Sequence, residues 1–340
     1  MQYINVTGVT SSGSSAVVDL LKEYSCIGSY EKEYTYEHIF LCHPEGLFET
    51  EQILETHFFG LHTDVAIRRF IQKANDVLNS FGGNSFWSTT KKEKYLQCVR
   101  RYIDSICDKE GEYVSCVEEM NYWRRKIEMI SIILKRNNIV RKIYPQKYGW
   151  YTLKVCKNDL RMYTRKLFYD YLDIVTCGEE KKEYYLFDGL VSLTNITYLK
   201  EIGVKDIKNI IVLRDPRDRY LGEMLIKDSG EGIAVVPTDA ELYCENYKVA
   251  MELLEEQNLE ECCIVWFEDL ILKYDETVRK IERYLNIGKE MHDTNIGQKL
   301  NLSISCKNCR LYERDDLKTK YYKPLSIIKD KLGKYLYHNN

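Results

Sequence analysis

The chain alternates short, continuous apolar runs with longer stretches in which apolar residues recur every three or four positions. The clearest runs cover residues 3–6, 184–187, 209–213 and 262–267. Continuous apolar runs of this length are typical of parallel strands that are covered on both faces. Helical spacing follows the runs, as in Ala16–Tyr24 and Tyr274–Leu285. The alternation predicts an α/β fold in which helices flank a parallel sheet.

The region from residue 50 to residue 175 has a different character. It is rich in Lys, Arg, Glu, Tyr and Ile. A period of 3.6 residues, which favours helices, recurs in three stretches: 95–107, 117–135 and 159–171. A turn is expected at 81–85. No low-complexity linker interrupts the sequence, so we predict a single α/β domain over residues 1–340 that carries a large, mainly helical insertion at 50–175.

Composition narrows the classes of partner. The 340 residues are 44% hydrophobic and 30% charged, which is typical of a globular protein. The net charge of −3 favours neither a nucleic-acid partner nor an anionic membrane surface. No apolar run reaches the roughly 18 residues of a membrane span. Residues 1–6 lack the features of a secretory signal. We therefore expect a cytoplasmic protein whose twelve cysteines are reduced. No metal is expected, because the Cys306–Cys309 pair has no second ligand pair nearby.

A glycine-containing loop follows the first predicted strand and precedes a helix. The spacing Gly8-x4-Gly13-Ser14-Ser15 is that of a phosphate-binding P-loop, except that Ser14 stands where a nucleoside triphosphatase has Lys. Glycines allow the backbone N–H groups to turn inward, and the helix amino terminus adds about half a positive charge. The candidate phosphate-binding residues are Thr10, Ser11, Ser12, Gly13, Ser14 and Ser15. A serine-rich turn that only caps the helix is an equally good interpretation of the loop taken alone.

Arginines cluster after the strand that ends at Leu213. The segment reads Arg214-Asp215-Pro216-Arg217-Asp218-Arg219. In open parallel sheets, ligands bind beyond the carboxyl ends of the strands. A guanidinium can hold a phosphate through two parallel hydrogen bonds, so Arg214 and Arg217 are candidate anion ligands. The alternative is a salt-bridged helix entry with Pro216 in its first turn.

Taken together and in this order, the two motifs resemble those of the sulfotransferases that use 3′-phosphoadenosine-5′-phosphosulfate (PAPS). The resemblance rests on Ser12–Ser15 and on Arg214–Asp218, and it extends over residues 1–25 and 184–335. The stretch 266–270 with the following helix looks like the family's strand, Glu-Asp-Leu and helix element. The stretch 305–308 resembles the basic carboxyl-terminal loop that closes over the nucleotide, which adds Lys307 and Arg310 as candidate nucleotide-binding residues.

The resemblance implies a fold, a donor and a reaction. It implies a P-loop-type α/β fold in which Ser12–Ser15 hold the 5′-phosphosulfate of PAPS and Arg214 holds the 3′-phosphate. The product nucleotide would be 3′,5′-adenosine bisphosphate (PAP). The partner would be an acceptor with a hydroxyl group. A saccharide is the expected class, because Val236–Asp239 resembles a segment of bacterial members that act on glycans.

A general base must take the acceptor proton in such a transfer. The resemblance points to Asp188, which follows a predicted strand, and His38 is a second candidate. Asp188-Gly189 is equally a plain turn. The other acidic and histidine residues that compete for the role are Glu31, Glu33 and His43.

The sequence departs from the family at three places, one of which is the absence of the usual Gly/Trp pattern after Lys307. Ser11 stands where the family usually has Lys or Arg, and Gly222 stands where it usually has a 3′-phosphate Ser. Six basic residues of the insertion are candidate replacements for the missing cation: Arg68, Arg69, Arg124, Arg125, Arg141 and Lys142. Two other functions stay open: a P-loop kinase acting on a small molecule, and a catalytically degenerate protein that binds a nucleotide or serves as a scaffold.

Overall fold

The described chain divides into two compact units. Unit 1 consists of Met1–Ile39 and Gly178–Asn340, and unit 2 consists of Phe40–Cys177. The computed structural model describes residues 2–29, 36–56, 60–79, 87–113, 148–178, 180–230, 232–292 and 296–338, together with Trp123, Lys126 and Ile130. Within these residues, no helix is both long and apolar enough to cross a bilayer.

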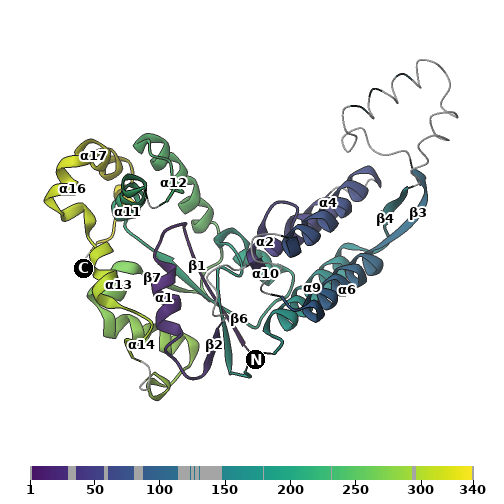
Figure 1. The fold of residues 1–340 in the computed structure, drawn as a ribbon, viewed down its shortest axis with the longest axis horizontal. Coiled ribbons are helices and arrows are strands. Elements are labelled where there is room, and N and C mark those ends of the chain that lie inside the picture. Colours follow the sequence, from purple (N-terminus) through teal and green to yellow (C-terminus); the bar gives the residue numbers. More distant parts are fainter. Residues whose placement is uncertain are drawn as a thin grey trace. The chain divides into compact units, whose positions relative to one another are not determined.

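Unit 1 is built on a five-stranded parallel sheet (Figure 1). Its strands are β1 (Gln2–Gly8), β2 (Ile27–Ser29), β5 (Tyr184–Asp188), β6 (Ile207–Leu213) and β7 (Cys263–Trp266). They lie in the order β2-β5-β1-β6-β7, and every pairing is parallel. Val6 of β1 is opposite Asp188, and Gly8 is opposite Val212 of β6. The carboxyl ends of these three central strands therefore share one edge of the sheet.

Helices cover both faces of the sheet, as predicted. The main ones are α1 (Ser14–Leu21), α10 (Ile196–Glu201), α11 (Pro216–Ser229), α12 (Ala240–Glu255), α13 (Phe267–Leu272), α14 (Tyr274–Leu285) and α17 (Tyr322–Lys331). Side chains alternate along β6, so Ile210 and Val212 pack with α1, α13 and α14. Ile211 and Leu213 face the opposite way and pack with α11, α12 and α17. The α/β class is thereby confirmed.

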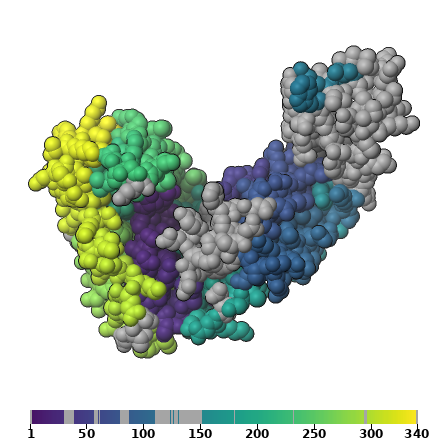
Figure 2. Space-filling model, in the orientation of Figure 1, coloured from purple at the N-terminus to yellow at the C-terminus, as the bar shows by residue number. Residues whose placement is uncertain are grey.

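Short elements complete unit 1. They are η2 (Leu193–Asn195), η3 (Lys289–Met291), α15 (Leu302–Ser305), η4 (Cys306–Asn308), η5 (Leu311–Glu313), α16 (Asp315–Lys320) and η6 (Gly333–Tyr335). Buried Glu23, just after α1, accepts hydrogen bonds from Lys299 N and Leu300 N at 2.9 Å each. His292 Nε2 lies 3.0 Å from the same carboxylate. These bonds fix the carboxyl-terminal segment to the end of α1, and Figure 2 shows that segment beside the amino-terminal one on one face of the unit.

The described residues of unit 2 are mainly helical and include one antiparallel pair of strands. Its helices are α2 (Tyr36–Cys42), which begins in unit 1, α3 (Leu47–Thr56), α4 (Gly60–Asn79), α6 (Thr89–Ile106) and α9 (Lys157–Thr176). Phe40, Phe70, Tyr95 and Tyr171 pack ring against ring in its core. The predicted helices at 95–107 and 159–171 correspond to α6 and α9. The antiparallel pair β3 (Cys107–Tyr113) and β4 (Tyr148–Leu153) was not predicted. The predicted turn at 81–85 and most of the predicted helix at 117–135 fall outside the described residues.

Candidate functional site

The glycine-containing loop joins β1 to α1, and two of its glycines are required by space. A Cβ at Gly8 would lie 2.5 Å from the carbonyl oxygen of Val212. Gly13 caps α1 with φ of 85°, a left-handed conformation that favours glycine. A Cβ at Gly13 would also lie 2.5 Å from Cδ2 of Phe267. The loop therefore passes close to β6 and α13, with the amino terminus of α1 open beside it.

Serine side chains line this loop in different environments. Ser12 is buried, and its Oγ has no hydrogen-bond partner among the described residues. Ser11 is partly exposed and has a φ of 63°, which is uncommon for a residue with a side chain. Ser14 and Ser15 open α1 and are at least partly exposed. A buried hydroxyl without a partner is costly in a folded protein and suits a site that holds a polar ligand.

Arg214 joins the glycine-containing loop to the carboxyl-terminal loop. Its Nη1 donates to Ser11 O at 3.2 Å, and its Nη2 donates to Asn308 O at 2.6 Å. The guanidinium carbon lies 5.0 Å from the ring centroid of Phe267. Arg214 is 9% exposed, and its Nε has no hydrogen-bond partner. Among the described side chains, no carboxylate forms an ion pair with it. The structure thus brings the glycine-containing loop and the arginine segment after β6 into direct contact around the buried positive charge of Arg214.

Two further side chains of α11 hold the phosphate loop. Arg219 Nε donates to Thr10 O, and its guanidinium carbon lies 5.5 Å from the ring centroids of both Tyr243 and Tyr247. Glu223 accepts a hydrogen bond from Ser11 Oγ. Sequence reasoning did not identify Glu223. Its spacing of four residues from Arg219, which puts both on one side of a helix, was the only available signal.

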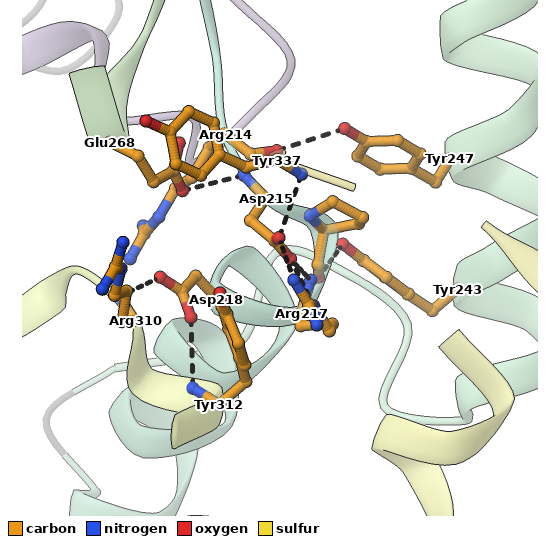
Figure 3. Close-up of polar contacts among 11 residues, drawn as sticks. Arg214, Asp215, Arg217, Asp218, Tyr243, Tyr247, Glu268, Arg310, Tyr312 and Tyr337 are labelled. Carbon is orange, nitrogen blue, oxygen red and sulfur yellow. Dashed lines mark hydrogen bonds and ion pairs between the residues drawn. The ribbon is translucent and has the colours of Figure 1, made fainter. Parts of the chain in front are cut away.

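The Arg217 guanidinium is already paired with other side chains of the protein. Its Nε and Nη2 donate to Asp215 at 2.9 and 2.6 Å, and its guanidinium carbon lies 3.6 Å from the ring centroid of Tyr312 (Figure 3). The fully buried Asp215 also accepts from Tyr337 N at 3.1 Å. This is the geometry of the salt-bridged helix entry, so Arg214 rather than Arg217 offers a donor to a ligand.

The carboxyl-terminal loop is fixed by Asp218 (Figure 3). This buried carboxylate accepts from Arg310 N and, at 3.2 Å, from Tyr312 N. Arg310 has a φ of 57°, and its Nε is buried without a hydrogen-bond partner. Lys307 is exposed in η4. Arg310 therefore lies against the arginine cluster, whereas Lys307 points its charge to solvent.

Two buried carboxyl groups of this cluster hold protons unusually tightly. Burial raises the pKa of Glu268 to about 7, although Asp215 N donates to its Oε1 at 2.9 Å. Burial, assisted by the nearby charge of Asp215, raises the pKa of Asp218 to about 6. Oε2 of Glu268 has no hydrogen-bond partner among the described residues. Near neutral pH, Glu268 and Asp218 together carry less negative charge than two fully ionised carboxylates would. They therefore offset less of the positive potential of the arginines.

The candidate bases come from other segments of the chain. Asp188 ends β5, and burial raises its pKa, with Lys22 opposing the effect and Asp19 adding to it. His38 belongs to α2, but its side chain lies outside the described residues, as do Glu31 and Glu33. His43 belongs to unit 2.

The candidate replacement cations belong to unit 2. Arg68 pairs with Asp64 at 2.8 Å, and Arg69 lies 3.8 Å from Glu45. The other four candidates, Arg124, Arg125, Arg141 and Lys142, lie outside the described residues. At the position where the resemblance leads us to expect a cation, Ser11 Oγ donates a hydrogen bond to Glu223.

Gly222 lies on α11 directly beside the Arg214 guanidinium. A Cβ at this position would lie 3.7 Å from both Nη1 and Nη2, which is ordinary van der Waals contact. A hydroxyl carried there would lie beside the Arg214 guanidinium. The space for the missing serine is therefore present.

Comparisons with known proteins found a likeness to solved structures. No family model matches the chain, and no curated protein matches it in sequence. The crystal structure of the sulfotransferase STF9 from Mycobacterium avium is similar, with a TM-score of 0.34 and 10% sequence identity. The match covers 96% of this chain and 76% of that one. Similarity at this level does not indicate which ligand the site binds.

Proposed function

We propose that unit 1 binds PAPS and transfers its sulfuryl group to the hydroxyl of an acceptor, a glycan or glycolipid. The phosphosulfate would lie at the loop of residues 10–15 and the amino terminus of α1, and the 3′-phosphate at Arg214. The proposal draws on the motif resemblance for the donor and on the site geometry for the position of the anion.

Arg214 carries the proposal. The Arg214 guanidinium is 9% exposed, donates to two carbonyl oxygens and forms no ion pair with a carboxylate of the described residues. An unpaired buried charge is unfavourable, and a bound anion would offset that cost. Among the described residues, Nε of Arg214 and Oγ of Ser12 are buried without hydrogen-bond partners, so each could donate to a phosphate oxygen.

The remaining residues of the loop have roles that follow from their position. Backbone N–H groups at the start of α1 would stabilise the charge that develops on the leaving phosphate oxygen. Arg214 and Arg219 hold the loop through the carbonyls of Ser11 and Thr10, so those N–H groups are oriented before the donor binds. Such prior ordering reduces the entropic cost of binding.

Calorimetric titration with PAP tests the proposal. The wild-type protein should bind PAP more tightly than magnesium ATP or GTP. Arg214→Ala should weaken PAP binding by about 2–4 kcal/mol, roughly 30- to 1000-fold in Kd, because a buried charge-assisted bond is lost. Lys323→Ala, which removes an exposed cation of α17, serves as the control and should have a small effect. An unchanged affinity in Arg214→Ala would refute the assignment of the 3′-phosphate.

Binding of a nucleotide without transfer is the second candidate function. The absence of a cation at Ser11 favours it, because the hydroxyl there is bonded to a carboxylate instead. The two functions differ in one measurement: PAP would bind in both cases, but PAPS would be consumed only by a transferase. A preference for magnesium ATP would instead indicate a kinase.

A further inference from the structure

The contact between Ser11 and Glu223 joins a hydroxyl of the phosphate loop to a buried carboxylate. Glu223 is 4% exposed, and each of its oxygens has a partner. Oε1 accepts from Ser11 Oγ, and Oε2 accepts from Val235 N at 2.8 Å. The carboxylate is therefore held in one orientation with its proton-accepting oxygen on the loop hydroxyl.

The surroundings of this pair are charged on one side. Arg214 Nη1 and Arg219 Nε contact the carbonyl oxygens of Ser11 and Thr10, respectively. Arg219 lies one helical turn before Glu223 on α11. Two guanidiniums thus flank the loop backbone, while the carboxylate takes its side-chain hydroxyl. A negatively charged carboxylate such as Glu223 would repel the sulfate of the donor, so it is poorly suited to donor binding. We therefore expect Glu223 to have another role.

The backbone of Ser11 points to the same conclusion. A left-handed φ of 63° is unfavourable for a residue with a Cβ. Both the carbonyl and the hydroxyl of Ser11 are held in this conformation, the first by Arg214 and the second by Glu223. Glycine would adopt the conformation without strain. We therefore expect the Ser11 side chain to have a role other than shaping the loop.

We propose that Ser11 and Glu223 form a proton relay for the transfer reaction. This inference rests on the proposed function, which puts the phosphosulfate on the loop that carries Ser11. In the step, a bond forms between the acceptor oxygen and sulfur, and the bond from sulfur to the 5′-phosphate oxygen breaks. The electron pair of the broken bond goes to the phosphate of PAP. The acceptor proton passes to Ser11 Oγ as the proton of Ser11 passes to Glu223 Oε1, which holds it as a neutral carboxylic acid at the end of the step.

Two substitutions isolate the relay from the structure of the loop. Ser11→Gly removes the hydroxyl and suits the left-handed backbone. Glu223→Gln keeps an oxygen for Val235 N–H and an amide beside Ser11, but accepts no proton. Glu282→Gln, which alters another buried carboxylate bonded to a hydroxyl (Tyr24 OH, 3.0 Å), is the matched control. Each protein is measured for PAP affinity by calorimetry, for thermal unfolding, and for PAPS consumption with water and with glucose as acceptor probes.

The expected result separates kcat from binding. Ser11→Gly and Glu223→Gln should bind PAP within about twofold of the wild type and unfold at similar temperatures, while kcat for PAPS falls roughly 100-fold or more. The double variant should be no slower than either single variant, since the two groups act as a unit. Glu282→Gln should retain the wild-type kcat.

Other outcomes overturn the relay. Full turnover in Glu223→Gln, or a loss of turnover that only follows a loss of PAP affinity, would make the pair structural. Loss of turnover confined to Asp188→Asn would assign the proton to Asp188 instead. A wild type that binds PAP but consumes no PAPS would remove the transfer reaction and the relay together. A wild type that binds no PAP would remove the proposed function itself.

Discussion

Restoring a serine at Gly222 should tighten nucleotide binding. Because a Cβ at this position would meet the Arg214 guanidinium at 3.7 Å, the substitution fits without displacing the arginine. The hydroxyl would add one hydrogen bond to the charged phosphate that Arg214 is proposed to hold. Such a bond contributes about 1–2 kcal/mol, so Gly222→Ser should lower the Kd for PAP roughly 5- to 30-fold.

Gly222→Ala is the control that distinguishes the effect of the added hydroxyl on PAP binding from the effect of any side chain on the stability of α11. Both substitutions replace a glycine inside α11 and should raise the free energy of unfolding by about 0.5–1 kcal/mol. Only Gly222→Ser should change the calorimetric affinity for PAP. Equal affinities in the two variants would show that the face of α11 at Gly222 does not meet the phosphate, and the position of the 3′-phosphate would have to be abandoned.

Three further substitutions test the surroundings of the site. Gly13→Ala should lower the free energy of unfolding by about 1–3 kcal/mol in denaturant titrations and weaken PAP binding, because φ is 85° and a Cβ would strike Phe267; unchanged stability would contradict this. Asp215→Asn should destabilise the protein by about 3 kcal/mol, because Arg217 loses its carboxylate partner; wild-type stability in urea would refute the structural role. For Glu268, the folded pKa of about 7 exceeds the ordinary 4.5, so folding binds a proton and the free energy of unfolding should fall as pH rises from about 4.5 to 7. Glu268→Gln should reduce that decline, and an identical decline in both proteins, measured by urea titration at several pH values, would show that another group causes it.

Much of the sheet could be predicted from the sequence because its strands are buried on both faces. The runs at 184–187 and 209–213 became β5 and β6 with small changes at their ends. The run at 262–267 stops at Trp266, because Phe267 begins α13. Strands with few apolar residues gave no such signal. β2 has three residues, and β3 reads Cys-Asp-Lys-Glu-Gly-Glu-Tyr, so its pairing with β4 depends on backbone hydrogen bonds rather than on a hydrophobic pattern.

The partners of the site residues could not be predicted in the same way. The sequence grouped Arg214 and Arg217 as two phosphate ligands, since both follow one strand. Their partners differ: Arg217 folds back onto Asp215, and Arg214 reaches Ser11 and Asn308. Side-chain direction at a strand end depends on the rotation of the next helix and on the path of distant loops, which no local pattern records.

The sequence by itself determined three features: the order of the apolar segments that form the parallel strands, the glycine-containing loop after β1, and the arginines after β6. Local periodicity and turn chemistry specify each of them. Only the tertiary structure decided that Glu223 holds Ser11, that Asn308 completes the contacts of Arg214, and that Gly222 faces the same guanidinium. These contacts join residues up to 212 positions apart. They form when packing of the helices against the sheet brings the segments together, and their energies depend on burial that only the folded chain creates.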